Sequence, residues 1–152
     1  MTDPVDFGSM TPRFELPLLF AAQAQKEFFV NEAHSLVDAL LHPVVKGTTP
    51  TPPQSPTEGE SWIVAADSTD VFTGRTDQVA TLQSGQWCFA KPVEGMTVFD
   101  SSLSKRRFYR GGWQVAADVI PPAGGSIQDM EARISINLII AALQKAGIVT
   151  IS

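Results

Sequence analysis

The chain has 152 residues, of which 43% are hydrophobic and 18% charged, so it has the size and composition of one folded domain and is not disordered by low hydrophobicity. Its net charge of −5 argues against a nucleic-acid partner. No apolar run approaches the roughly 20 residues that cross a bilayer, so membrane insertion is not expected. The single cysteine, Cys88, excludes an intrachain disulfide and a cysteine zinc site.

Two stretches rich in proline and glycine, Thr48 to Pro56 and Val119 to Ser126, are typical of linkers because proline favours extended backbone. They divide the chain into three predicted segments. These are an N-terminal extended segment and helix (1–47), a β-rich module (57–118), and a C-terminal helix and tail (126–152).

The N-terminal segment has helical spacing from Ala21 to Leu41. The predicted apolar stripe of this helix comprises Val30, Ala33, Val37 and Leu40. A helix with so broad an apolar face is not stable alone and needs a partner element or subunit.

The middle segment alternates with period two and is interrupted by glycine turns. Its predicted strands are Ser61 to Ala65, Val71 to Phe72, Gln78 to Leu82, Gln86 to Ala90, Met96 to Asp100, Arg107 to Tyr109 and Trp113 to Ala116. This pattern predicts a small antiparallel meander or barrel, and with the two flanking helices it gives an α+β fold.

The middle segment also contains an approximate internal echo. Glu58-Gly59 precedes one strand and Glu94-Gly95 precedes a later one, and each unit closes with a glycine turn before Trp87 or Trp113. The spacing differs between the copies, so a true duplication is left open.

In the C-terminal segment Ser126 is the expected helix N-cap and Gly147 the expected stop. Apolar residues at helical spacing include Ile127, Met130, Ile134, Leu138 and Ala141. This helix is apolar around more than half its circumference, which favours burial between subunits. Because isoleucine-rich stripes favour three strands, we expect a homo-oligomer and most readily a trimer.

The sequence offers little for catalysis. The two histidines, His34 and His42, lack further ligands at metal spacing, and Cys88 has no neighbouring base. No acid–base pair of carboxylates stands out from the polar loops. We therefore expect a non-enzymatic protein without cofactor or metal.

The binding candidates are aromatic and basic side chains close to glycine turns: Trp87, Arg107, Tyr109 and Trp113. Rings on a sheet stack on sugars while neighbouring amide and guanidinium groups bond hydroxyls, so these four form a predicted glycan site. For the tryptophans, burial in the core is the alternative. The basic run Lys105-Arg106-Arg107, with Arg110, suits an anionic glycan or phosphate, or else a charged strand that resists aggregation.

Several segments resemble a phage-derived family of unknown function that occurs in prophage and gene-transfer-agent structural clusters. They are Thr11-Pro12-Arg13, Gln23-Ala24-Gln25-Lys26-Glu27, Asn31-Glu32-Ala33, Glu58-Gly59-Glu60-Ser61-Trp62, Gly85-Gln86-Trp87, Pro92-Val93-Glu94-Gly95-Met96 and Gly111-Gly112-Trp113. The resemblance covers about residues 11–116. It implies a virion-associated tail-fibre or head-spike component that binds host surface polysaccharide, but it brings no catalytic residues.

The leading hypothesis is therefore a phage-type virion structural protein, made in the bacterial cytoplasm, with other virion proteins and a host glycan as partners. The first alternative is a structural adaptor or assembly factor without a ligand. A small glycan-cleaving enzyme comes last.

Overall fold

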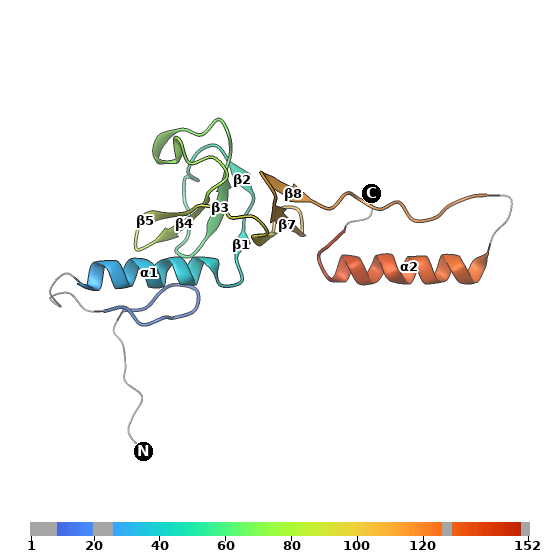
Figure 1. The fold of residues 1–152 in the computed structure, drawn as a ribbon, viewed down its shortest axis with the longest axis horizontal. Helices are drawn as coiled ribbons and strands as arrows, with labels where there is room; N and C mark the ends of the chain where they lie inside the picture. Colours follow the sequence, from blue (N-terminus) through green and yellow to red (C-terminus); the bar gives the residue numbers. More distant parts are fainter. Residues whose placement is uncertain (1–8, 20–25, 126–128, 150–152) are drawn as a thin grey trace, which may run out of the picture. The chain divides into compact units, whose positions relative to one another are not determined.

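The computed structural model describes residues 9–19, 26–125 and 129–149 and divides into two compact units, Met1–Pro92 and Val93–Ser152 (Figure 1). Within these residues, two α-helices and eight short strands give an α+β fold, which confirms the predicted fold class. The strands form open sheets, and none of the described sheets closes into a barrel. The sheets are therefore open and mixed, with a parallel strand pair that the predicted antiparallel meander did not include.

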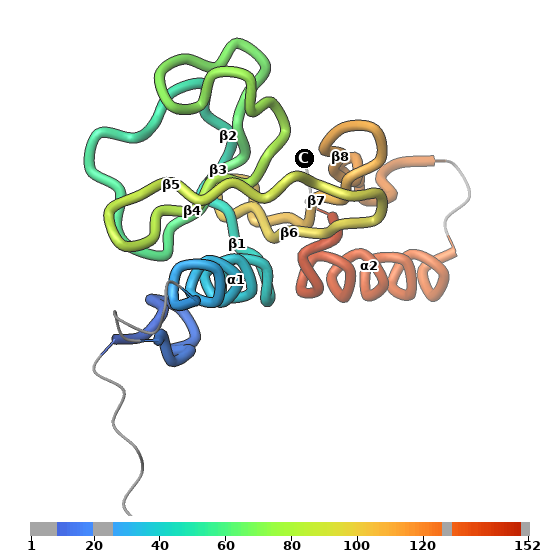
Figure 2. Tube along the Cα trace, turned by 60° about the vertical axis from the view of Figure 1, so that its left-hand side comes forward, coloured from blue at the N-terminus to red at the C-terminus, as the bar shows by residue number. Residues whose placement is uncertain are grey.

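The first unit holds one helix, a short 3-10 helix and a sheet. Its elements are α1 (Lys26–Leu40), β1 (Val44–Val45), β2 (Thr48–Thr49), β3 (Ser61–Val64), the 3-10 helix η1 (Asp70–Phe72), β4 (Val79–Gln83) and β5 (Gln86–Ala90). The sheet has the order β2-β3-β4-β5, with β2 parallel to β3 and the other pairs antiparallel. Both views place α1 alongside this sheet (Figures 1 and 2).

One predicted strand of this unit is wrong. Val71 and Phe72 lie in η1, because Asp70 has a positive φ of 53° and the amide of Phe72 donates to the carbonyl of Thr69 in a turn. The turn places the fully buried Phe72 ring against Val64 in the core. Tight packing of this ring, and not strand pairing, fixes the segment.

The N-terminal segment is tied to α1 by an anchor built on the buried carboxylate of Asp38. The hydroxyl of Thr11 and the amides of Arg13 and Phe14 all donate to this carboxylate, at 2.7, 3.2 and 2.6 Å. The Arg13 guanidinium donates to carbonyl oxygens at the end of α1, those of Asp38, Ala39 and His42. The Gln83 side-chain amide also donates to this carboxylate, at 3.4 Å. We call Asp38 with the three donors of the N-terminal segment the Asp38 anchor.

The buried side of α1 therefore differs from the predicted stripe. Asp38 and Ala39 are buried, whereas Val37 and Leu40 of the predicted stripe are exposed. A buried acid is stable here because protein donors replace the water that a carboxylate otherwise needs. Residues 20–25, where the predicted helix was to begin, lie outside the described residues.

The second unit holds the antiparallel strands β6 (Thr97–Asp100), β7 (Lys105–Tyr109) and β8 (Trp113–Val115), followed by α2 (Met130–Lys145). The N-cap of α2 is Asp129, whose side chain accepts a hydrogen bond from the amide of Ala132 at 2.9 Å. The predicted cap Ser126 lies outside the described residues. Gly147, with φ of 67°, follows the helix end as predicted.

The strands β3, β4 and β5 (the first repeat) and the strands β6, β7 and β8 (the second repeat) share one hydrogen-bonding plan. The amide of Gly59 donates to the Leu82 carbonyl at 2.8 Å, and that of Gly95 donates to the Tyr109 carbonyl at 2.9 Å. Both glycines have φ of 81°. The internal echo in the sequence thus corresponds to two backbones of the same construction.

The glutamate of each Glu-Gly unit accepts hydrogen bonds from backbone amides of the glycine turn that comes later in the same repeat. The Glu58 carboxylate accepts hydrogen bonds from the amides of Ser84 and Gly85, both at 2.6 Å. The Glu94 carboxylate accepts one from the amide of Gly111 at 2.8 Å. The glutamates therefore fix the hairpins that precede Trp87 and Trp113.

Candidate functional site

The second repeat exposes one face of its sheet, which we call the open face. Register pairs Thr97 with Phe108, Phe99 with Arg106, and Phe108 with Gln114, so these side chains point to the same side. With Arg110, which continues the alternation beyond β7, the open face consists of Thr97, Phe99, Arg106, Phe108, Arg110 and Gln114. All six residues are exposed, and none is acidic.

The open face combines cations, a ring and an amide. The Arg110 guanidinium lies over the Phe108 ring at 5.9 Å from its centroid, and the Gln114 amide nitrogen donates to the Arg110 carbonyl at 3.1 Å. None of the described residues forms an ion pair with Arg106 or Arg110. Both guanidiniums are therefore available to form an ion pair with an anionic group of a ligand.

Three of the four predicted glycan-site residues lie on the opposite face of the same strands, and each is half-buried. Arg107 forms an ion pair with the fully buried Asp100, Nη2 to Oδ2 at 2.7 Å. The rings of Tyr109 and Trp113 meet edge to face with centroids 5.4 Å apart. The structure thus brings Tyr109 and Trp113 together, and it uses the charge of Arg107 to satisfy a buried carboxylate.

Trp87, the fourth predicted residue, belongs to the first unit. Its ring packs edge to face on Phe72 and Trp62, at centroid distances of 5.0 and 5.6 Å. It is half-buried beside the core cluster that Phe72 forms with Val64 and Ala80. This packing agrees with the core alternative for Trp87, which the sequence left open.

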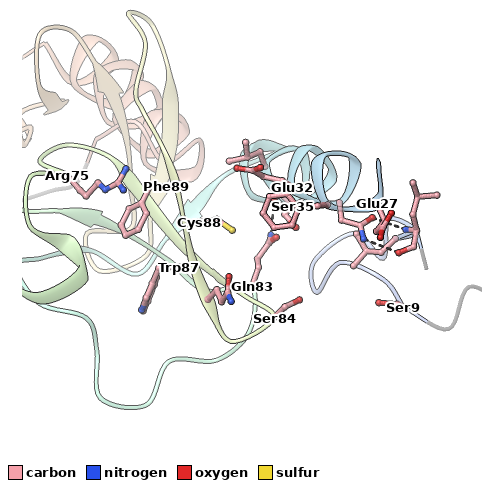
Figure 3. A pocket seen from close by; sticks show the side chains of 16 residues that line it. Ser9, Glu27, Glu32, Ser35, Arg75, Gln83, Ser84, Trp87, Cys88 and Phe89 are labelled. Atoms are coloured by element: carbon pink, nitrogen blue, oxygen red, sulfur yellow. Dashed lines mark hydrogen bonds between the residues drawn. The ribbon is translucent and has the colours of Figure 1, made fainter. Parts of the chain in front are cut away.

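A groove of about 720 Å³ runs along α1, β4 and β5 within the first unit (Figure 3). Its lining mixes an acid, Glu32, a cation, Arg75, and the aromatic rings of Trp87 and Phe89. In Figure 3, Cys88 points toward α1, whereas Phe89 and Arg75 lie on the other side of β5. The Arg75 guanidinium is stacked over the Phe89 ring at 4.6 Å from its centroid.

The thiol of Cys88 is unsuited to nucleophilic chemistry. Burial raises its pKa, and the nearby carboxylates of Glu32 and Glu58 raise it further. The thiol therefore stays protonated at neutral pH, where a nucleophile would need the thiolate.

No cluster of three metal-ligating side chains occurs within the described ranges. His34 Nδ1 lies 2.9 Å from the carbonyl oxygen of Pro17, so this ring ties the N-terminal segment to α1. Neither described helix has the length and apolar character to cross a membrane.

Residues 30–114, more than half of the chain, match the family model of a protein of unknown function, DUF2793. The chain belongs to the DUF2793 family. The match runs from within α1 into β8, so the DUF2793 region contains both repeats except Val115, and the whole open face. No curated protein matches the chain.

Sequence reasoning did not select Phe108 and Gln114 of the open face, and it treated Arg106 and Arg110 only as part of a basic run. The available signal was the period of two, which separates Arg106 and Phe108 from Arg107 and Tyr109. The period does not show which of the two sets faces outward.

Proposed function

We propose that this DUF2793 protein is a non-enzymatic component of a phage-type virion, a fibre or head spike, and that its open face binds acidic host surface polysaccharide. The observation that carries the proposal is the pair of exposed guanidiniums, Arg106 and Arg110, beside the Phe108 ring on an acid-free sheet face. Guanidinium groups bind carboxylates through two parallel hydrogen bonds, and an aromatic ring packs on the apolar face of a sugar.

A local basic face on an acidic protein suits a repeating anionic chain better than nucleic acid. The chain carries a net charge of −5, which repels a long polyphosphate beyond the contact area. An acidic polysaccharide has fewer charges per unit length and offers hydroxyls to the Gln114 amide. A homo-oligomer would present several such faces and raise weak single-site affinity through avidity.

The virion part of the proposal is supported by the resemblance at Thr11-Pro12-Arg13 and at the two Glu-Gly units, Glu58-Gly59 and Glu94-Gly95. The proposal accordingly includes other virion proteins as partners.

One observation favours the structural adaptor as a second candidate. In the first repeat the Gln83 amide nitrogen, at the position equivalent to Arg110, donates to the carbonyl of Ser35 in α1 at 2.9 Å. The equivalent face there is thus occupied by a helix. A helix of another virion protein could cover the open face in the same way.

Binding of the full chain to a panel of bacterial capsular polysaccharides and lipopolysaccharides separates the candidates. We expect binding to acidic members, weakening as salt rises, and no binding to neutral dextran. The double variant Arg106→Ala/Arg110→Ala should lose at least about tenfold in affinity, because each charged hydrogen bond contributes about 1.5–3 kcal/mol. The matched control Lys91→Ala, at an exposed cation of the first unit, should bind as the wild type does.

Binding that survives in the double variant would refute the open face as the site. No binding to any panel member would leave the adaptor.

A further inference from the structure

The helix α2 carries an exposed stripe with heptad spacing on the side away from its own unit. The stripe, which we call the α2 stripe, consists of Glu131, Ile134, Leu138, Ala141 and Lys145. Successive members are three, four, three and four residues apart, the spacing of a two-helix seam. Leu138 at its centre is 66% exposed, whereas Ile140 on the other side of the helix is 5% exposed.

The charges of the α2 stripe are placed symmetrically. Glu131 and Lys145 each lie seven residues from Leu138, at opposite ends of a stripe about 21 Å long at 1.5 Å per residue. The remaining charged side chain of α2, Arg133, donates to the carbonyls of Pro122 and Gly124 in its own unit. The stripe itself is therefore neutral, with an acid at the N-terminal end and a base at the C-terminal end.

We propose that the α2 stripe is a self-association surface whose partner is α2 of a second copy, packed antiparallel about a two-fold axis at Leu138. In this pairing Glu131 faces Lys145 of the partner subunit at both ends. The larger Ile134 lies within about one residue, or about 1.5 Å, of the level of the small Ala141 of the partner subunit, so a large side chain is placed beside a small one on both sides of Leu138. A two-fold interface of this kind repeats each contact twice.

Charge distinguishes this pairing from the trimer that the isoleucines alone predict. In a parallel bundle all copies of Glu131 would meet in one layer and all copies of Lys145 in another, and like charges in a layer repel. In the antiparallel pair each layer instead contains one glutamate and one lysine, which attract each other. The pairing stands on the α2 stripe alone and does not depend on polysaccharide binding.

Sedimentation equilibrium of the full chain, with charge-swap variants, tests the proposal. We expect a dimer that E131K or K145E weakens by about tenfold, because each change turns two attractive pairs into repulsive ones. The double variant E131K/K145E should regain wild-type association. The control K91E makes the same charge change at an exposed site outside α2 and should leave the dimer unchanged.

In a parallel assembly each charge swap would replace one layer of like charges by a layer of the opposite charge. A trimer whose association the double variant does not restore would therefore overturn the proposal. A monomer at all concentrations would also overturn it. Disulfide trapping in a Cys88→Ser background is the second measurement. A chain with E131C should crosslink to a chain with K145C, and crosslinks between identical variants alone would contradict the antiparallel arrangement. Helical circular dichroism of each variant verifies that α2 is folded.

Discussion

The two repeats share a backbone and differ in what covers one face. In the first repeat every residue of β4 is buried, and α1 is anchored at the face on which Gln83 lies. In the second repeat the residues of the equivalent face are exposed, and no helix covers them within the described residues, although Gly147 lies beside the Phe99 ring. The same hydrogen-bonding plan therefore supports a core in one place and an exposed surface in the other.

Position-by-position comparison shows how side chains make this difference. The register aligns Val79 with Arg106, Thr81 with Phe108, Gln83 with Arg110, and Cys88 with Gln114. At these positions the first repeat has an aliphatic group, a hydroxyl, an amide and a thiol, whereas the second has two cations, an aromatic ring and an amide. The Glu-Gly units determine the shared backbone conformation of the two repeats. The alternating side chains determine whether this face is buried or exposed.

The largest expected effect contrasts two phenylalanines. Phe72→Ala should lower the free energy of unfolding of the first unit by about 3–5 kcal/mol, because it empties a fully buried core position. Phe108→Ala, on the open face, should cost less, about 1 kcal/mol, because its ring is 37% exposed and loses less burial. Urea denaturation of both variants measures the contrast, and similar losses would mean that the open face is packed like a core.

The next effect concerns the Asp38 anchor, which ties the N-terminal segment to α1 in the first unit. Asp38→Ala should destabilise the first unit by about 3 kcal/mol, since each buried donor left without an acceptor costs about 1–3 kcal/mol. Hydrogen exchange of the Arg13 and Phe14 amides should accelerate in parallel. Asp38→Asn keeps one acceptor oxygen and serves as the control with a smaller loss. Unchanged exchange at both amides would show that the anchor does not hold this segment.

The smallest effect tests a difference beside the Glu-Gly turns, where Glu60 aligns with Met96. The Thr57 amide, and then the Lys46 ammonium at 2.9 Å, hold the pKa of Glu60 below its usual range. The stability that the ionised Glu60 contributes is thus complete above the pKa of Glu60 in the unfolded chain. It is lost as the pH falls through the lowered pKa of Glu60 in the folded protein.

Glu60→Met should accordingly cost less than about 1 kcal/mol near neutral pH, as is usual for solvent-accessible pairs, and almost nothing once the carboxylate is protonated. Denaturation of wild type and variant at neutral and strongly acidic pH measures this. An equal difference at both pH values would assign the effect to packing.

Much of the backbone could be predicted from local sequence. The glycine turns before Trp87 and Trp113, and the end of α2 at Gly147, follow from glycine's access to positive φ. Val71-Phe72 looked like a strand because both residues favour extended structure, yet the buried position of Phe72 determined a 3-10 turn. Tertiary packing, which local propensity does not contain, decided that segment.

The faces were harder to predict than the elements. Alternation places Arg107, Tyr109 and Trp113 on one side and Arg106 and Phe108 on the other, but the buried Asp100 that pairs with Arg107 is recognised only in three dimensions. Likewise, the helical pattern of α1 gives no reason to bury an acid such as Asp38. Its burial is explained only by its hydrogen bond from Thr11, which is distant in the sequence. Polar contacts between residues distant in the sequence therefore decided which side chains are buried, and the sequence pattern does not contain them.

The most direct test of the central claim is an amide NMR titration of the full chain with an acidic capsular oligosaccharide that the panel identifies as bound. We predict saturable shift changes in β6, β7 and β8 that centre on Arg106, Phe108 and Gln114, with the equivalent positions Val79, Thr81 and Cys88 unchanged. Shift changes centred instead on the groove along α1 and β5 would contradict the assignment of the open face as the polysaccharide site.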